Sequence, residues 1–424
     1  MEREAFVYMD LPNGPVLVGR LWSRIRKGRE SATFEYDPGW LTRADRFALE
    51  PALILAPGPY HTGTDRPMFG AIGDSAPDRW GRVLMRRAER KAAEREKRTP
   101  RTLFEMDFLL LVDDEARAGA LRFAEKEGGP FVAEPGKFRI PPIVELNKLL
   151  SATERVIEDR ESEEDLRLLI APGSSLGGAR PKASVRDNDG NLAIAKFSHR
   201  DDNANIVLWE SVALSLAASC KIAVPGWRVE PVGNKAALIL RRFDRQNGTR
   251  IPFVSAMSML GASDNDPHSY LEIAEALRQS GAAPNEDLRQ LWRRIVFNVL
   301  ISNTDNHLRN HGFLYEGPAG WRLSPAYDMN PVPVDVKPRV LSTSIDPDDP
   351  SASIELAFAA AEYFGLKERE ARSIAAEIGT IVSVWRQSAE TVGLSRAEID
   401  RMASAFEHHD LKKALAGNAQ GRNA

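Results

Sequence analysis

The chain has little cysteine and no long apolar segment. Its 424 residues include one cysteine, Cys220, which excludes an intrachain disulfide. No run of about 18 apolar residues could cross a bilayer, and no apolar stretch of a secretory signal follows Met1–Glu4. The 57 Lys and Arg residues nearly balance the 60 Asp and Glu residues, so the net charge of −3 predicts no general attraction to nucleic acid. We therefore expect a cytoplasmic protein that does not contact a membrane.

Two phosphate-binding signatures are also missing. No Gly-x-Gly-x-x-Gly sequence occurs, which leaves a dinucleotide-binding fold unsupported. The span Gly173–Gly178 has the length of a P-loop, but Ala179-Arg180 follows where Gly-Lys-Ser/Thr is required. Any nucleotide chemistry must therefore depend on other residues.

The most informative pattern that is present consists of an Asp, an Asn and a second Asp. Asp305 is followed five positions later by Asn310, and Asp328 follows a predicted β-hairpin. In protein kinases the first Asp orients or deprotonates the attacking hydroxyl, and the Asn and second Asp hold Mg²⁺ against the ATP phosphates. The same residues could instead form an Asn- and Asp-rich loop that caps two elements.

The neighbouring sequence supports the kinase interpretation. Residues 291–301 carry apolar side chains at helical spacing and predict a buried helix. Residues 312–315 and 321–323 predict two short strands joined by a turn. Asn310 then lies just before one strand and Asp328 just after its partner, so both side chains are expected at one edge of the hairpin.

Upstream segments follow in the order that a kinase requires. A glycine-rich stretch at residues 171–182 precedes a predicted hairpin at residues 183–197, and Lys196 lies near the end of its second strand. A helix is predicted over residues 205–220, and Glu210 near its start is the candidate ion-pair partner of Lys196. Single Lys and Glu residues are usually solvated, so the order of the segments carries the prediction.

The remaining segments predict strands at the beginning of the chain and helices at its end. Strands are predicted at residues 5–9, 15–22, 31–36 and 121–123. Helices are predicted at residues 78–98, 353–364, 368–389 and 395–407. The Gly- and Asn-containing tail after the last helix is expected to be frayed.

Several ordered motifs together resemble the HipA family of bacterial toxins from toxin–antitoxin modules. The motifs are Ser175–Lys182, Arg242–Arg245, Thr304–Asn310 and Tyr327-Asp328, and Phe69–Met85 is similar to the N-terminal signature of that family. The resemblance spans residues 1 to about 410 and implies an α+β, two-lobed protein-kinase-like fold. In this fold a strand-rich N-terminal subdomain precedes a mostly helical C-terminal lobe. With the Gly- and Pro-rich composition near residue 130, it predicts an N-terminal subdomain at residues 1–127, a linker at 128–144 and a kinase core at 145–424.

The resemblance also implies roles for individual residues. Asp305 would be the catalytic Asp, and Asn310 and Asp328 the Mg²⁺ ligands. The ATP contacts would be Gly177, Gly178, Ala179, Arg180, Lys182, Lys196, Arg241, Phe243, His307, Asn310 and Asp328. Ser175, or else the adjacent Ser174, would be the autophosphorylated serine. Arg241 stands where well-known members have Glu, and Arg180 where Gln is commoner.

The function implied is that of a serine/threonine protein kinase toxin that uses ATP and Mg²⁺. Its substrate would be a Ser or Thr hydroxyl of a protein, which in the best-known members is an aminoacyl-tRNA synthetase. Its partner would be a helix-turn-helix antitoxin, and DNA would be contacted only through the antitoxin complex. Two alternatives stay open: a small-molecule phosphotransferase, and a non-catalytic regulatory partner of a DNA-binding antitoxin.

Overall fold

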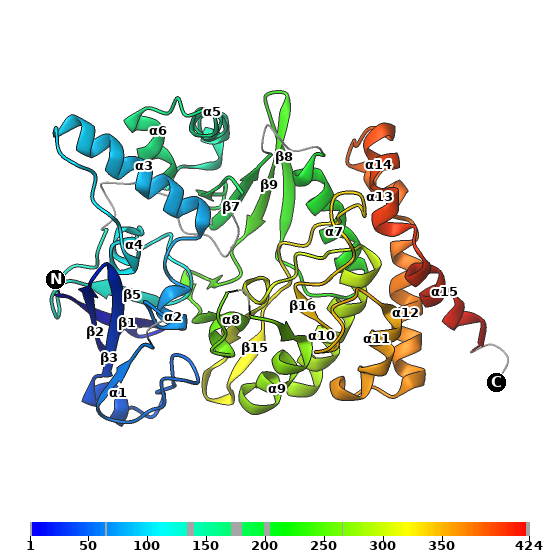
Figure 1. Cartoon of the computed structure of the whole chain (residues 1–424), viewed down its shortest axis with the longest axis horizontal. Coiled ribbons are helices and arrows are strands. Elements are labelled where there is room, and N and C mark those ends of the chain that lie inside the picture. Colours follow the sequence, from blue (N-terminus) through cyan, green and yellow to red (C-terminus); the bar gives the residue numbers. More distant parts are fainter. Residues whose placement is uncertain are drawn as a thin grey trace. The chain divides into compact units, whose positions relative to one another are not determined.

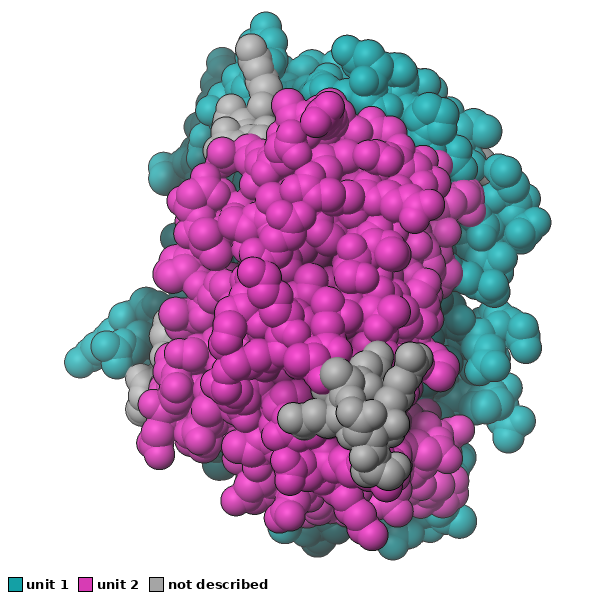
Figure 2. Space-filling model, turned by 90° about the vertical axis from the view of Figure 1, so that its right-hand side faces the viewer, with its two compact units in different colours: residues 1–200, 230–261 teal, residues 201–229, 262–424 magenta. Residues whose placement is uncertain are grey.

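The structure, a computed structural model, divides the chain into two compact units (Figure 2). Unit 1 comprises residues 1–200 and 230–261, and unit 2 comprises residues 201–229 and 262–424. The residues that the structure describes are 2–63, 66–133, 140–170, 180–198, 204–264 and 266–420. Five residues of the glycine-rich stretch, all predicted to have functional roles, therefore lie outside the described part of the chain: Ser174, Ser175, Gly177, Gly178 and Ala179.

Unit 1 begins with an antiparallel sheet in the order β4-β3-β2-β1-β5. Its strands are β1 (Glu2–Leu11), β2 (Gly14–Arg26), β3 (Arg29–Tyr36), β4 (Pro59–His61) and β5 (Leu121–Ala124). Pro12 and Asn13 turn β1 into β2, and Gly14, the first residue of β2, has the positive φ of 109° that a glycine adopts without strain. The four predicted strands are confirmed, although most of them are longer than expected.

A second sheet of four strands has the order β6-β7-β9-β8. Its strands are β6 (Lys182–Arg186), β7 (Leu192–Phe197), β8 (Trp227–Val232) and β9 (Lys235–Arg241). Helices α3 (Arg79–Arg95), α5 (Leu146–Ile157) and α6 (Glu163–Ile170) share one apolar core with this sheet (Figure 1). The predicted hairpin is confirmed as β6 and β7, and the helix predicted at residues 78–98 is confirmed as α3.

Short elements complete unit 1. They are α1 (Pro38–Thr42), α2 (Gly70–Gly73), α4 (Glu105–Leu111), η1 (Ile143–Glu145), β10 (Arg245–Gln246), β11 (Thr249–Arg250), β12 (Phe253–Ser255) and α8 (Ala256–Met259). The boundaries predicted for an N-terminal subdomain and a linker stay predictions.

Unit 2 is mostly helical. Its helices are α7 (Ile206–Ser219), α9 (Tyr270–Ser280), α10 (Pro284–Leu300), α11 (Ile354–Ala359), α12 (Glu368–Val382), α13 (Trp385–Thr391), α14 (Arg396–Phe406) and α15 (His409–Gln420). Its short elements are β13 (His268–Ser269), η2 (Leu308–Asn310), β14 (Gly312–Tyr315), η3 (Gly317–Ala319), β15 (Trp321–Leu323), β16 (Thr343–Ser344) and η4 (Ala361–Phe364). In the described part of the chain, no helix combines the length and apolarity needed to span a bilayer.

Helix α10 lies in the core of unit 2. It starts with Pro284, and the missing N–H of proline costs nothing there because an N–H in the first turn has no partner within the helix. The negative charges of Glu286 and Asp287 in the first turn stabilise the positive end of the helix dipole. Trp292 and Ile295 are fully buried or nearly so. The predicted helix is therefore confirmed, with one further turn and more at its start.

The C-terminal helices follow the sequence pattern only in part. The helix predicted at residues 353–364 ends as a 3₁₀ turn, η4, and the one predicted at residues 368–389 is interrupted between α12 and α13. The expectation of a frayed tail after the helix at residues 395–407 is wrong for His409–Gln420, which form α15, and residues 421–424 lie outside the described residues. Helix α15 forms there because Leu411 and Ala414 are buried, and α15 packs on α12.

Candidate active site

The loop that carries Asp305 (residues 302–311, the Asp305 loop) starts at a sharp turn after α10. Ser302 has a left-handed φ of 52°. The N–H of Asn303 donates to the carbonyl of Asn298 at 2.9 Å, which satisfies a carbonyl that the end of the helix would otherwise leave unpaired. The Ser302 hydroxyl donates to the carbonyl of Ala405 at 2.8 Å. The direction of the loop is therefore fixed at its first two residues.

Hydrogen bonds of buried asparagine side chains fix the position of the Asp305 loop. The Tyr270 hydroxyl accepts hydrogen bonds from Nδ2 of Asn298 at 3.0 Å and from Nδ2 of Asn306 at 2.7 Å. Oδ1 of Asn306 accepts from the N–H of Ser342 at 2.9 Å. Burial of the hydroxyl raises the pKa of Tyr270 to about 12. Because these groups are buried, each bond fixes the backbone more firmly than a solvated bond would.

Asp305 and Asn310 lie together in this loop. Nδ2 of Asn310 donates to the carbonyl oxygen of Asp305 at 2.8 Å, and the Asp305 side chain is 64% exposed. Among the described residues, Oδ1 of Asn310 is buried without a hydrogen-bond partner. The loop thus presents a solvent-facing carboxylate beside an amide oxygen that has spare bonding capacity.

Asp328 follows the β14–β15 hairpin in the chain. The pairing of Phe313 with Leu323 sets the start of β14 beside the end of β15. Asp328 has a left-handed φ of 57°, which a non-glycine residue adopts only at an energetic cost. The preceding residue, Tyr327, donates its hydroxyl proton to the carbonyl of Arg309 at 2.8 Å, which connects this segment to the Asp305 loop.

The donor set fits Mg²⁺. This ion prefers one or two carboxylate or amide oxygens from the protein, and it fills its remaining positions with water and phosphate. Oδ1 of Asn310 and the carboxylate of Asp328 are ligands of this kind, and the orphaned state of the amide oxygen leaves it available. The described residues contain no group of three or more His, Cys, Asp or Glu side chains that could hold a metal, and the binding of Mg²⁺ by Asn310 and Asp328 stays a prediction.

Two residues near the loop were not anticipated from the sequence. Arg294 is buried beneath the loop and donates from Nη2 to the carbonyl of Ser324. Burial lowers the pKa of Arg294 to about 10, and burial together with the Arg294 charge lowers the pKa of His311 to about 3. Lys337 is partly exposed, with Nζ at 3.8 Å from Oδ1 of Asp305. The sequence contains a signal for the burial of Arg294, because this residue lies three positions after the apolar Leu291 and so on the same face of α10. It contains no such signal for Lys337.

Half of the chain matches a known protein family. Residues 174–385 match the family model described as the HipA-like C-terminal domain. The chain belongs to the HipA-like family. The resemblance predicted from the motifs is therefore confirmed.

Relatives of this HipA-like chain carry kinase names. "Putative kinase Y4mE" of Sinorhizobium fredii is 25% identical over 330 residues, which cover 70% of this chain and 71% of the relative. A "Putative kinase" of Haemophilus influenzae is 29% identical over 119 residues, which cover 26% of this chain and 34% of the relative.

A solved structure shares the fold. A chain of the HipA, HipB and operator DNA complex from the Shewanella oneidensis toxin–antitoxin system matches with a TM-score of 0.67. The match covers 98% of this chain and 97% of that chain at 19% identity. At this identity the likeness concerns the fold alone, and it confirms the expected α+β, kinase-like architecture.

The HipA-like loop motif ends at Lys182 in a buried ion pair. Nζ of Lys182 lies 2.9 Å from Oδ2 of Asp78, and both side chains are 5% exposed. Oδ1 of Asp78 caps α3 by accepting from the N–H of Gly81, and the indole of Trp80 donates to the carbonyl of Lys182. Within unit 1, the predicted phosphate ligand Lys182 therefore also joins β6 to α3.

The other predicted ATP ligands of unit 1 are more accessible. Lys196 is half-buried and lies directly across from Lys182 in the β6–β7 pair, and Arg180 is exposed. Arg241 is exposed at the end of β9, and Phe243 is half-buried. Their contacts with ATP stay predictions.

In unit 2, Glu210 is buried in α7, only 3% exposed, and His307 is half-buried in the Asp305 loop. The predicted pairing of Glu210 with Lys196 stays a prediction.

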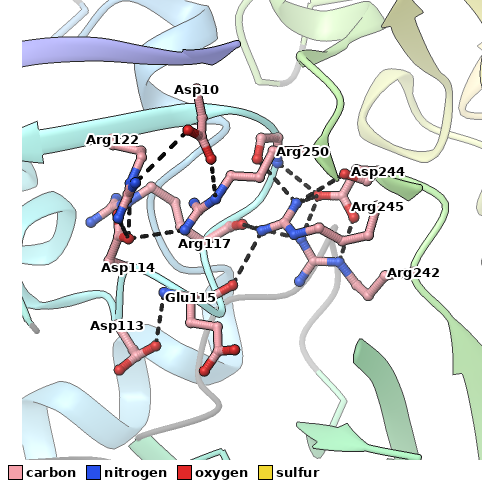
Figure 3. A network of polar contacts seen from close by, with 11 residues as sticks. Asp10, Asp113, Asp114, Glu115, Arg117, Arg122, Arg242, Asp244, Arg245 and Arg250 are labelled. Atoms are coloured by element: carbon pink, nitrogen blue, oxygen red, sulfur yellow. Dashed lines mark hydrogen bonds and ion pairs between the residues drawn. The ribbon is translucent and has the colours of Figure 1, made fainter. Parts of the chain in front are cut away.

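The Arg242–Arg245 motif forms a buried network in unit 1 (Figure 3). Arg242 and Asp244 form an ion pair in which both side chains are fully buried. Oδ2 of Asp244 also accepts from the N–H of Gly119 at 2.7 Å and from Arg245 at 2.9 Å. Burial alone would raise the pKa of Asp244, but the charges of the two arginines outweigh burial and keep this pKa below its usual value.

The network continues to the first sheet. Arg242 donates to the carbonyl of Ala116 at 2.9 Å. Arg250 contacts Asp114 at 2.9 Å and Asp10, on β1, at 3.3 Å (Figure 3). The motif thus fastens the turn at residues 113–119, which precedes β5, to the segment after β9. Sequence reasoning identified these residues by family motif alone and did not anticipate this structural role.

Proposed function

We propose that this protein is an ATP-dependent serine/threonine protein kinase of a toxin–antitoxin module. The observation that carries the proposal is that the amide nitrogen and the amide oxygen of Asn310 are in different bonding states. Its Nδ2 is bound to the backbone of Asp305, while its Oδ1 is buried without a partner among the described residues. A loop that only caps two elements has no need for such an oxygen, because an unpaired buried acceptor is costly.

The transfer that we propose uses Asp305 as the base. Its exposed carboxylate accepts a hydrogen bond from the substrate hydroxyl and aligns the oxygen with the γ-phosphorus of ATP. The hydroxyl oxygen forms the new bond to phosphorus as the bond to the β,γ-bridging oxygen breaks. The hydroxyl proton passes to Asp305 and then to water, and ADP leaves. Asn310 and Asp328 would hold Mg²⁺, which neutralises charge on the β- and γ-phosphate oxygens when it is bound.

Other residues enter the proposal through the family motifs. We assign phosphate contacts to the backbone of Gly177, Gly178 and Ala179 and to Arg180, Lys182, Lys196 and His307. Arg241 and Phe243 would receive the adenine, and Glu210 would pair with Lys196. Ser175, or else Ser174, would be autophosphorylated.

The kinase names of the relatives support phosphoryl transfer. The similar solved chain comes from a complex of HipA with HipB and operator DNA, which supports a DNA-binding antitoxin as the partner of this chain. We propose a helix-turn-helix protein for that partner and a Ser or Thr of a protein, such as an aminoacyl-tRNA synthetase, as the phosphate acceptor.

Mass spectrometry of the protein incubated with Mg²⁺ and ATP tests the proposal. Wild type is expected to gain the mass of one phosphate, on Ser175 or Ser174, and Asp305→Ala is expected to gain none, since removal of the base leaves the hydroxyl unaligned. Asp400→Ala is the matched control, because Asp400 is an exposed carboxylate on α14 whose ion pair with Arg386 lies at the surface.

A folded Asp305→Ala protein that still transfers phosphate at the wild-type rate would overturn the assignment of Asp305. ATP binding without phosphorylation of the chain or of any protein substrate would favour the regulatory partner instead. Transfer to a sugar or an antibiotic alone would favour the small-molecule phosphotransferase.

A further inference from the structure

A strand-like segment crosses the Asp305 loop after Asp328. We call residues 337–344 the strap. The N–H and hydroxyl of Ser342 both donate to the carbonyl of Thr304, at 3.2 Å and 2.9 Å. The same N–H also donates to Oδ1 of Asn306. The strap is therefore bound to the residues on either side of Asp305.

Arg339 anchors the beginning of the strap. Its Nε donates to the Ser302 hydroxyl at 3.1 Å and its Nη2 to the carbonyl of Val299 at 2.8 Å. Its Nη1 pairs with Asp410 at 2.5 Å. Two of these contacts fix the guanidinium against the end of α10 and the start of the Asp305 loop, and the third fixes it to α15. Lys337 stands only two residues earlier in the chain.

Lys337 directs its ammonium group toward the catalytic Asp proposed above. Nζ lies 3.5 Å from the carbonyl oxygen of Thr304 and 3.8 Å from Oδ1 of Asp305. The Lys337 side chain is 42% exposed, and both contacts are long, so burial does not fix the position of the ammonium group. Among the described residues, Lys337 is the one that forms an ion pair with Asp305.

We propose that Lys337 is a catalytic residue that contacts the γ-phosphoryl group during transfer. The inference rests on the proposed kinase function. A phosphoryl group that approaches Asp305 brings negative charge next to a carboxylate, and the repulsion grows as the hydroxyl closes on phosphorus. An ammonium group beside Asp305 offsets that repulsion and stabilises the charge on the transferring oxygens. Lys337 stays protonated throughout, and the hydroxyl proton still passes to Asp305.

A structural role for Lys337 predicts different behaviour. If its ammonium group only supported the backbone at Thr304, its loss would destabilise the protein and would weaken nucleotide binding and turnover together. If Lys337 is catalytic, its loss should lower the rate of phosphoryl transfer and leave the binding of ADP unchanged. Fluoroaluminate with ADP and Mg²⁺ mimics the transferring phosphoryl group and does not depend on turnover.

The experiment compares Lys337→Met and Lys337→Arg with Lys412→Met. Lys412 is an exposed lysine on α15 and supplies the same chemical change in the same unit. We expect Lys337→Met to lower kcat by about 100- to 1000-fold, the order found when one transition-state donor is removed, with KM for ATP within about threefold of wild type. Its affinity for ADP with fluoroaluminate should fall by a similar factor, while its affinity for ADP alone is unchanged. Lys337→Arg should recover part of both losses, and Lys412→Met should match wild type.

Three outcomes would overturn the proposal. An unchanged kcat in a folded Lys337→Met protein would show that the ammonium group is not needed. A lower melting temperature, together with a lower kcat, a higher KM for ATP and a weaker affinity for ADP, would show that Lys337 only supports the loop. A wild-type protein that binds Mg²⁺ and ADP but transfers no phosphate and does not respond to fluoroaluminate would remove the kinase function and the role of Lys337 with it.

Discussion

A single side chain, Asn310, connects the two halves of the candidate active site. Its amide nitrogen holds the carbonyl of Asp305, and its amide oxygen is the group that we assign to Mg²⁺. An amide donates from its nitrogen and accepts at its oxygen, whereas an ionised carboxylate can only accept. We therefore expect the backbone contact with Asp305 and the proposed binding of Mg²⁺ both to depend on an asparagine at this position.

Two substitutions of Asn310 separate these tasks. Asn310→Asp keeps an oxygen for Mg²⁺ but loses the donor to Asp305, so we expect weaker transfer with an Mg²⁺ requirement close to that of wild type. Asn310→Ala loses both, and it should raise the Mg²⁺ concentration for half-maximal activity and cost about 1 kcal/mol of stability for the lost hydrogen bond. Magnesium titrations of activity, with urea denaturation alongside, measure the two effects. The same Mg²⁺ requirement in Asn310→Ala as in wild type would contradict the assignment.

At the scale of elements, the Asp305 loop depends on a tyrosine in α9 that is distant in sequence. The Tyr270 hydroxyl accepts from both Asn298 in α10 and Asn306 in the loop, and all three residues are buried. One hydroxyl thus sets the position of the loop relative to the helix that precedes it.

Tyr270→Phe is expected to weaken both stability and transfer. The substitution keeps the ring but leaves Nδ2 of Asn298 without its acceptor, at a cost of about 1–3 kcal/mol for a buried unsatisfied group, and leaves Nδ2 of Asn306 with the carbonyl of Thr343 alone. Chemical denaturation together with kcat measures the loss. Tyr363→Phe, at a tyrosine that is 58% exposed, is the matched control and should leave both unchanged. A Tyr270→Phe protein as stable as wild type would show that the two asparagines find other partners.

The sequence predicted the elements whose pattern is local. The Asp-Gly turn at residues 187–191 and the Gly- and Pro-containing turn at residues 316–320 located the two hairpins, and Asn205 and Cys220 proved to be the two caps of α7. The tail after residue 407 was misjudged because the burial of Leu411 depends on α12, which no local pattern shows. Lys337 and Tyr270 were missed for the same reason, since each meets Asp305 or its loop only through the tertiary fold.

At the scale of the whole molecule, the buried arginine network contributes to the integrity of unit 1. Asp244 supplies the negative charge between Arg242 and Arg245 and also binds the backbone at Gly119. A buried ion pair that loses one partner leaves an uncompensated charge, which is far more costly than the loss of a surface pair.

Asp244→Asn is therefore expected to destabilise the protein by about 3–5 kcal/mol. The control is Asp45→Asn, whose exposed partner Arg43 makes a surface pair worth at most about 1 kcal/mol. Thermal and urea denaturation of both variants measure the difference. Equal stability losses in the two proteins would rule out a special role for the network.

The division into two units has a consequence for synthesis. Residues 1–200 and 230–261 form unit 1, whereas residues 201–229 belong with 262–424, so the chain passes from one unit to the other three times. A ribosome releases the apolar helix α7 before the segments of unit 2 that follow residue 261 exist. Ten buried positions of α7 must then remain unburied, or be shielded by a chaperone, while more than half of the unit is still to be translated. A nascent chain that stalls in this interval carries Lys196 but not Asp305, so the set of residues that we propose for catalysis is complete only after Asp328 has been translated.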